Sequence, residues 1–209
     1  MNGDWQVVRR RVAIAGCVVD AGTGKPLASA EVRVVAMPQT FQKWLQFAAL
    51  PYGERWSKML ERPDRTRTRP DGLFYFMDVP DGKYGLQAAM PGSGSRFGKV
   101  EEPATVSRDA EGNIKMAFVK FALPPTLVKG RVAGAGQEAG VALARVRVKG
   151  SGERGFTDSQ GHYMVAGIEP GKRTLLVSAQ GYRTESQIFT LKEPGDSQTL
   201  DFTLKRENG

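Results

Sequence analysis

The chain has 209 residues, of which 40% are hydrophobic and 25% are charged, and this ordinary globular composition excludes an intrinsically disordered protein. The net charge of +8 comes without a polybasic tail, so it favours acidic partners only weakly. The single cysteine, Cys17, excludes an intrachain disulfide, and no run of residues reaches the roughly 18 apolar positions that a membrane span requires.

The N-terminal region resembles a secretion signal. Three arginines, at positions 9–11, precede an apolar stretch, and residues 14–17 (Ile-Ala-Gly-Cys) match a lipobox. A signal needs an apolar region of about 7 to 15 residues, whereas only Val12 and Ala13 separate the arginines from this tetrad. We therefore predict that Cys17 lies in a first β-strand and carries no lipid, and that synthesis is cytoplasmic without a cleavable signal. The final location stays open, and an exported or cell-surface assembly is one alternative.

An internal repeat organises the chain. The stretch from Gly16 to Val34 matches the stretch from Gly130 to Val148 at an offset of 114 residues. Residues 68–74 match residues 157–163 at an offset of only 89. The first copy therefore carries an insertion of 25 residues, which must lie between Val35 and Arg67.

Each copy is predicted to consist of short strands separated by turns. Val32 and Val34, like Val146 and Val148, alternate with charged residues, as is typical of a strand with one solvated face. With regular turn glycines between such strands, the pattern predicts an all-β protein of two tandem, seven-stranded, Ig-like or transthyretin-like antiparallel sandwiches. We expect the proline pair at 124–125 to be a stiff spacer between domain 1–124 and domain 125–209.

Both copies share a pattern of glycine, threonine and aromatic positions. In the first copy the pattern consists of Gly16, Val18, Asp20, residues 23–28, Ala30, Val32, Thr68, Asp71, Gly72, Phe74, Val79, Pro80, Gly82 and Tyr84. In the second it consists of Gly130, Val132, Ala142, Ala144, Val146, Thr157, Asp158, Gly161, Tyr163, Pro170, Gly171, Gly181 and Tyr182. This pattern resembles the carboxypeptidase regulatory-like domain, a prealbumin-like domain related to collagen-adhesin B-type repeats. The resemblance implies an accessory, spacer or adhesion module, and a shared fold alone does not assign a function.

The insertion, about residues 38–64, has helical periodicity. Thr40 is the expected N-cap, and Pro51 and Pro63 are the expected stops. The apolar residues at helical spacing are Phe41, Trp44, Leu45 and Ala48, followed after Pro51 by Tyr52, Trp56, Met59 and Leu60.

These aromatic side chains have two alternative roles. They either fold back on their own sandwich or form a surface for a partner or a membrane, since aromatic residues are enriched at the centres of interfaces. The candidate partner-binding residues are Phe41, Trp44, Phe47, Tyr52, Trp56, Met59, Leu60, Arg65, Arg67 and Arg69.

The three arginines in this set alternate along the chain. If the segment is extended, Arg65, Arg67 and Arg69 lie on one face of it, either as a solvated face or as a site for phosphates. Neither interleaved aromatic residues nor a nucleic-acid-binding motif accompanies them, so we do not expect a nucleic acid partner.

No catalytic set can be assembled from this sequence. The single histidine, His162, follows a turn glycine, and with Cys17 it would leave a zinc ion without two of its ligands. The hydrolases of similar fold require several histidines, and the iron dioxygenases require two histidines and two tyrosines. We therefore expect neither enzymatic activity nor a cofactor or metal.

The sequence favours a non-catalytic structural or interaction protein. It would contact partner proteins through its sandwich loops and its insertion, and one setting that we consider is a phage-tail-like or contractile injection assembly. The alternative is a carbohydrate-binding or adhesion module that binds glycans with exposed aromatic residues, for which Tyr182 and the insertion tryptophans are candidates.

Overall fold

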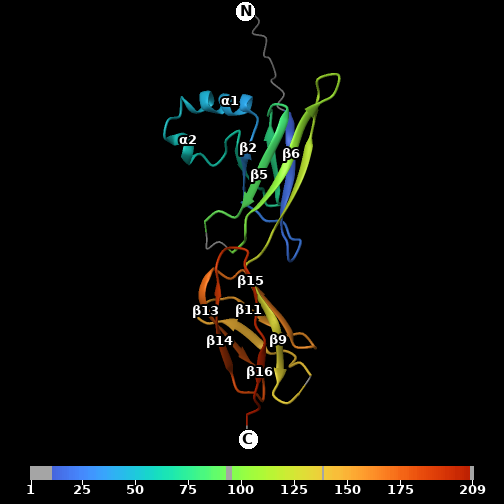
Figure 1. Cartoon of the computed structure of the whole chain (residues 1–209), viewed down its shortest axis with the longest axis vertical. Helices are drawn as coiled ribbons and strands as arrows, with labels where there is room; N and C mark the ends of the chain where they lie inside the picture. The colour runs from blue at the N-terminus through green and yellow to red at the C-terminus, as the bar shows by residue number, and fades with distance from the viewer. Residues whose placement is uncertain (1–10, 93–95, 138, 208–209) are drawn as a thin grey trace, which may run out of the picture. The chain divides into compact units, whose positions relative to one another are not determined.

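The computed structural model describes residues 11–92, 96–137 and 139–207 (Figure 1). The chain divides into two compact units. Unit 1 comprises Met1–Ala89 and Val100–Ala122, and unit 2 comprises Met90–Lys99 and Leu123–Gly209. The N-terminal arginines at positions 9 and 10 lie outside the described residues, whereas Cys17 lies in the first strand.

Unit 1 contains two sheets that enclose a core. One sheet has the strand order β4-β1-β8 and the other β3-β2-β5-β6-β7. The strands are β1 (Val12–Asp20), β2 (Glu31–Ala36), β3 (Arg65–Arg67), β4 (Leu73–Met77), β5 (Gly82–Ala89), β6 (Val100–Arg108), β7 (Ile114–Lys115) and β8 (Ala117–Leu123).

Unit 2 is built in the same way. One sheet has the order β11-β10-β13-β14, and in the other β9 lies between β12 and the two final strands, β15 and β16, which run parallel to it. The strands are β9 (Leu127–Gly134), β10 (Arg145–Val148), β11 (Arg154–Phe156), β12 (His162–Ala166), β13 (Gly171–Ser178), β14 (Glu185–Leu191), β15 (Ser197–Thr199) and β16 (Phe202–Leu204).

The predicted all-β fold of two sandwiches, with a short helical insertion in the first, is confirmed. The count of seven strands is not, because the described residues of each unit form eight strands. In unit 1 the additional strand is the two-residue β7, which ends a hairpin with β6. In unit 2 the last strand is interrupted between β15 and β16.

The core follows the alternation in the sequence. Val32 and Val34 are buried on one face of β2, while Arg33 between them is exposed. Val146 and Val148 are buried on β10 in the same way. Burial of each such side chain stabilises the fold by about 1.5–3 kcal/mol, so the period-2 pattern determines which face of the strand points inward.

The proline pair is part of unit 2 and not a free spacer. The Gly98 N–H donates to the Pro124 carbonyl at 2.8 Å, and Pro125 forms a bridge with Phe97. The side chain of Arg96 makes a 3.0 Å ion pair with Glu153. Residues 96–98 therefore pack against the second sandwich, and the boundary after residue 124 stays a prediction.

A buried threonine closes a loop in each unit. The Thr68 hydroxyl accepts from the Ala30 N–H at 2.9 Å and donates to the Leu27 carbonyl. The Thr157 hydroxyl accepts from the Ala144 N–H at 2.8 Å and donates to the Val141 carbonyl. Both side chains are almost fully buried, so each hydroxyl satisfies two backbone groups that water does not reach.

Replacing Thr157→Val should therefore destabilise unit 2 far more than Thr157→Ser. Valine keeps the shape of the side chain but leaves the buried Ala144 N–H and the buried Val141 carbonyl without a hydrogen bond, each at a cost of about 1–3 kcal/mol. Serine keeps the hydroxyl. Denaturant unfolding measures the difference. Equal unfolding free energies for the two variants would contradict this role for the hydroxyl.

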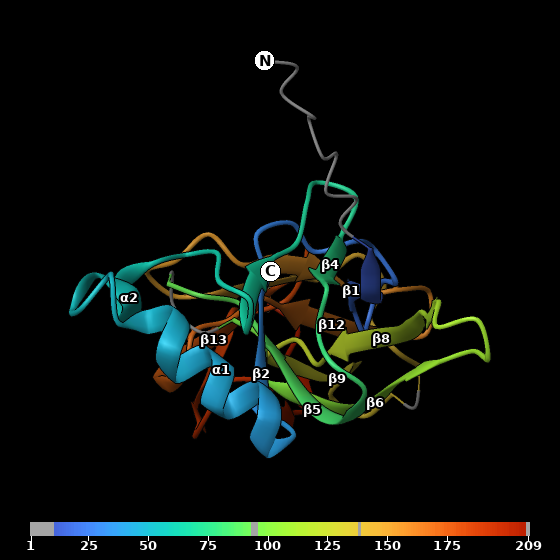
Figure 2. The same cartoon turned by 90° about the horizontal axis from the view of Figure 1, so that it is seen from above.

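The insertion forms two helices, α1 (Gln39–Ala49) and α2 (Arg55–Lys58). The predicted N-cap at Thr40 is wrong, because the N-cap is Pro38, two residues earlier, and it makes no side-chain cap hydrogen bond. The fixed φ of proline fits the entry into a helix, and the missing N–H is not needed there. In Figure 2, α1 lies alongside β2 and β5 of its own unit.

Candidate partner-binding site

One aromatic side chain anchors the insertion to unit 1. Phe41 is 1% exposed, and its ring stacks on Trp44 with a centroid distance of 5.7 Å and an interplanar angle of 10°. On its other side it meets Tyr84 edge-on at 5.8 Å. In α1, Phe41 is the buried residue. The helix is therefore held mainly by its first turn.

The tyrosine beneath Phe41 is itself fixed. The Tyr84 hydroxyl donates to the Pro80 carbonyl at 2.7 Å. Burial, followed by the nearby charge of Asp81, raises the pKa of Tyr84 to about 12. A raised pKa means that the folded state favours the neutral phenol, so this contribution to stability is complete below pH 10 and is lost as the pH rises towards 12.

Three large apolar side chains of the α1 segment are exposed. Trp44 is 49% exposed, Phe47 71% and Leu50, which caps the helix, 74%. They follow one another at three-residue spacing, so their side chains are neighbours along the helix surface. We call Trp44, Phe47 and Leu50 the α1 stripe.

The second half of the insertion is held by arginines. Trp56 is half-buried, and the Arg62 guanidinium lies 5.3 Å from its ring centroid. Arg62 also makes a 3.0 Å ion pair with Asp64 and donates to the Trp56 carbonyl at 3.1 Å. Tyr52 packs against the other part of the Trp56 indole at 5.6 Å, and like Leu60 it is about half exposed.

The three alternating arginines have three different environments. Arg65 pairs with Glu31 at 3.0 Å and donates to the Met59 carbonyl at 3.2 Å, so it fastens the insertion to the sheet. Arg67 ends β3, and within the described part of the chain it has no ion-pair partner. Arg69 lies beyond the strand, with its guanidinium 5.3 Å from the Tyr75 ring centroid. Because β3 ends at Arg67, only Arg65 and Arg67 lie within the strand, and the shared face of all three arginines stays a prediction.

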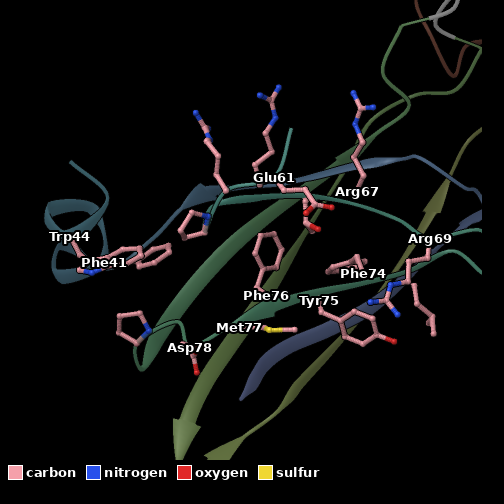
Figure 3. A pocket seen from close by; sticks show the side chains of 16 residues that line it. Phe41, Trp44, Glu61, Arg67, Arg69, Phe74, Tyr75, Phe76, Met77 and Asp78 are labelled. Atoms are coloured by element: carbon pink, nitrogen blue, oxygen red, sulfur yellow. The ribbon is translucent and has the colours of Figure 1, made fainter. Parts of the chain in front are cut away.

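A groove of about 810 Å³ lies between the insertion and the sandwich of unit 1 (Figure 3). The insertion contributes Phe41, Trp44 and residues 61–63 to its lining. The sandwich contributes β3 and β4, together with Arg69 between the two strands and Asp78 and Pro80 after β4. In Figure 3, Phe41 and Trp44 lie at one end of the groove, and Arg69 lies against Tyr75 at the other.

The groove brings together only part of the predicted set. Phe41, Trp44 and the three alternating arginines line it, whereas Phe47, Tyr52, Trp56, Met59 and Leu60 do not. Sequence reasoning missed the wall that β4 provides, which is formed by Leu73–Met77. The run Leu-Phe-Tyr-Phe-Met was assigned to a strand, but its position at the edge of a sheet depends on the pairing of distant strands.

His162 is the exposed first residue of β12 and follows a turn. Its ring nitrogen Nδ1 is 3.6 Å from Asp158, and the Asp158 carboxylate accepts from the backbone N–H groups of His162 and Gln160. The backbone hydrogen bond from His162, partly opposed by desolvation, keeps the pKa of Asp158 below its ordinary value. Among the described residues no three histidine, cysteine or carboxylate side chains cluster as a metal site would require. No helix among residues 11–92, 96–137 and 139–207 is long and apolar enough to cross a bilayer.

Residues 127–205 match the family model of the carboxypeptidase regulatory-like domain. The match covers most of unit 2 and agrees with the resemblance that the glycine and threonine pattern indicated. A search of curated proteins found no match to this sequence.

Several solved structures are similar to this chain in fold. The shaft pilin SpaA of Lactobacillus rhamnosus GG shares 11% identity over 94% of this chain and 97% of that one, with a TM-score of 0.40. The Bacillus anthracis TIE protein shares 17% identity over 93% of this chain and 34% of that one, with a TM-score of 0.43. A type II cohesin–X-dockerin complex from Acetivibrio cellulolyticus shares 16% identity over 39% of this chain, with a TM-score of 0.35. The chain covers only 58% of that cohesin–X-dockerin chain.

Proposed function

We propose that this chain is a non-catalytic interaction module, and that the α1 stripe is the surface through which it contacts an apolar patch of another protein. The observation that carries the proposal is that one apolar side chain of α1 is buried while others in the same segment are exposed. Phe41 alone is fully buried and docks α1, while Trp44, Phe47 and Leu50 leave large apolar area in water. Contiguous exposed apolar surface of this kind marks interaction sites.

The sandwich does not need the α1 stripe for its own stability. Unit 2 has the same two-sheet plan and a complete core without any such helix. Exposed aromatic residues supply large contact area at low entropic cost when they become buried in an interface. A stripe that contributes little to its own domain is therefore best explained by a contact with another chain.

The narrower alternatives receive less support. Tyr182, the glycan-stacking candidate of unit 2, is partly buried and packs against the core, so its ring is not free to stack on a sugar. The setting in a phage-tail-like or contractile assembly rests on no observation in the structure and is not part of the proposal. Other proteins are the partners proposed here.

Photo-crosslinking from position 47 tests the α1 stripe. A photoreactive amino acid in place of Phe47 should yield a discrete crosslinked species with one partner protein in the native host. The same amino acid in place of Ile188, which is similarly exposed on unit 2, should not. Equal crosslinking from both positions, or none from position 47, would contradict the proposal.

A paired substitution separates contact from stability. The double variant Phe47→Ala with Leu50→Ala should change the free energy of unfolding by no more than about 0.5 kcal/mol, as surface changes usually do. With the photoreactive amino acid placed at position 44 instead, the crosslink to the partner should form in the wild-type background and be lost in this double variant. A variant that unfolds much more easily than the wild type would show that the stripe belongs to the local core.

A further inference from the structure

The groove of unit 1 opens between the edge strands of its two sheets. β3 is the terminal strand of one sheet and β4 is the terminal strand of the other, and both line the groove. An edge strand presents backbone N–H and C=O groups that no neighbouring strand satisfies. Such groups can accept an additional strand.

The register identifies which backbone groups of β4 are open. The Val18 N–H donates to the Gly72 carbonyl at 2.9 Å, and in the same register Gly16 lies opposite Phe74 and Ala15 lies opposite Tyr75. Because hydrogen-bonded and non-hydrogen-bonded pairs alternate in antiparallel sheets, Phe74 directs its backbone groups to β1 and Tyr75 directs its own away from β1.

The open stretch begins at Tyr75. The outward groups of Leu73 are occupied by the preceding turn, since the Arg69 N–H donates to the Leu73 carbonyl at 2.9 Å and the Leu73 N–H donates to Asp71 Oδ1 at 3.0 Å. Tyr75 and Met77 therefore offer their backbone groups on the side away from β1. By the same alternation, Arg67 on β3 directs its backbone groups away from β2.

The walls of the groove differ in chemistry along its length. Figure 3 shows Phe74 and Phe76 in the middle, Phe41 and Trp44 at one end, and Arg67 and Arg69 towards the other. Neither of these arginines has an ion-pair partner among the described residues. The buried Nε of Arg67 also lacks a hydrogen-bond acceptor there. A bound carboxylate would pair with the two guanidinium groups through charge-assisted hydrogen bonds.

We propose that this groove binds an extended peptide segment of another protein, which pairs with the open edge of β4 as an additional strand and places a carboxylate side chain near Arg67 and Arg69. The backbone hydrogen bonds of strand addition provide affinity, and the side-chain positions provide specificity. Apolar side chains of the peptide contact the exposed groove residues Met77 and Trp44. The inference rests on the proposed interaction function and adds a mode of binding and a partner chemistry.

Charge complementarity favours an acidic peptide as the occupant. The groove lining contains four arginines, at positions 62, 65, 67 and 69, against two carboxylates, Glu61 and Asp78. Two of the arginines are already occupied, Arg62 by Asp64 and Arg65 by Glu31. The positive charge that remains lies at the end of the groove where Arg67 and Arg69 stand.

A pair of synthetic peptides tests this inference on the full chain. The probe is acetyl-Glu-Val-Thr-Val-Glu-amide, which offers a carboxylate at the arginine end in either strand direction, and the control carries lysine in place of both glutamates. Amide NMR should show shifts centred on Tyr75 and Met77, with slowed exchange of the Tyr75 N–H. The lysine peptide should bind at least about tenfold more weakly, since like charges suppress wrong partners.

The variant Tyr75→Pro removes the open donor. Proline is tolerated on an edge strand where its nitrogen faces away from the sheet, so the fold should persist while peptide binding is lost. If this variant does not fold, charge reversal provides a second test. The double variant Arg67→Glu with Arg69→Glu should prefer the lysine peptide. The variant Phe47→Ala should bind the glutamate peptide like the wild type, because Phe47 does not line the groove.

Four results would overturn the inference. The first three are the absence of shifts in β4 at millimolar peptide, equal affinity for the two peptides, and unchanged peptide binding by Tyr75→Pro. The fourth is protection of the Tyr75 N–H that rises with protein concentration in the absence of peptide. That result would show that a second copy of the chain covers the edge of β4. Peptide binding without a crosslink from position 47 would refute the proposed contact of the α1 stripe but would support the groove as a peptide-binding site. A crosslink from that position without peptide binding would do the reverse.

Discussion

Replacing Gly130→Ala is expected to disrupt unit 2. A Cβ at this position would lie 1.9 Å from the Leu200 carbonyl oxygen and 2.6 Å from its carbon, both of which are backbone atoms. The chain is held there, because the Leu200 N–H donates to the Lys129 carbonyl at 2.8 Å. Overpacking usually costs about 1–3 kcal/mol, and we expect a larger loss because neither strand can yield. Hydrogen exchange of β9 in the full chain measures it.

Gly152→Ala is the matched control. Nothing lies within 4 Å of a Cβ built at Gly152, and its backbone does not have a positive φ. This variant should exchange like the wild type, or slightly more slowly, because alanine restricts the unfolded chain more than glycine does. Wild-type protection of β9 in Gly130→Ala would show that the last strand can move away, and would contradict the rigid packing argued here.

Replacing Phe41→Ala is expected to release α1 from unit 1. Removal of a buried phenylalanine costs about 3–5 kcal/mol, and this ring is the main buried contact of the helix, between Trp44 and Tyr84. Because the sandwich has its own core, the loss should fall on the helix. We expect a red shift of tryptophan fluorescence and rapid proteolytic cleavage within residues 39–60.

Phe47→Ala supplies the control for this experiment. It removes the same side chain from the same helix at a position that is mostly exposed. Its fluorescence and proteolysis should match those of the wild type, since exposed substitutions usually change stability by less than about 0.5 kcal/mol. Equal cleavage of both variants would mean that Phe41 does not anchor the helix.

These two experiments address different consequences of the repeat and the insertion. The variant Gly130→Ala tests why glycine is required where the first strand of unit 2 meets the last. Gly16 has the same role in unit 1, where a Cβ would lie 2.2 Å from the Val119 carbonyl oxygen. Phe41 tests how the insertion is positioned. If Phe41→Ala releases α1, it should also weaken peptide binding in the groove, because Phe41 and Trp44 form one of its ends.

The sequence was sufficient for the fold class because the signals were local. The alternation at Val32 and Val34, and the turn glycines at fixed offsets, predict strands and turns without knowledge of their partners. Thr68 and Thr157 also stood at matching positions, although only the structure shows that their hydroxyls each satisfy two buried backbone groups. The proline pair was less informative, because the segment that packs against it comes from residues 96–98.

The sequence by itself determined that residues 38–64 contain an apolar helix, and only the tertiary structure decided which of its side chains are buried. Helical periodicity defines a face but not what lies opposite that face, so Phe41 and Trp44 belong to the same pattern, yet Phe41 is buried and Trp44 is half exposed. The groove was beyond sequence reasoning for a similar reason. Its walls are the edges of two sheets, and an edge exists only once long-range pairing has assigned every other strand a neighbour.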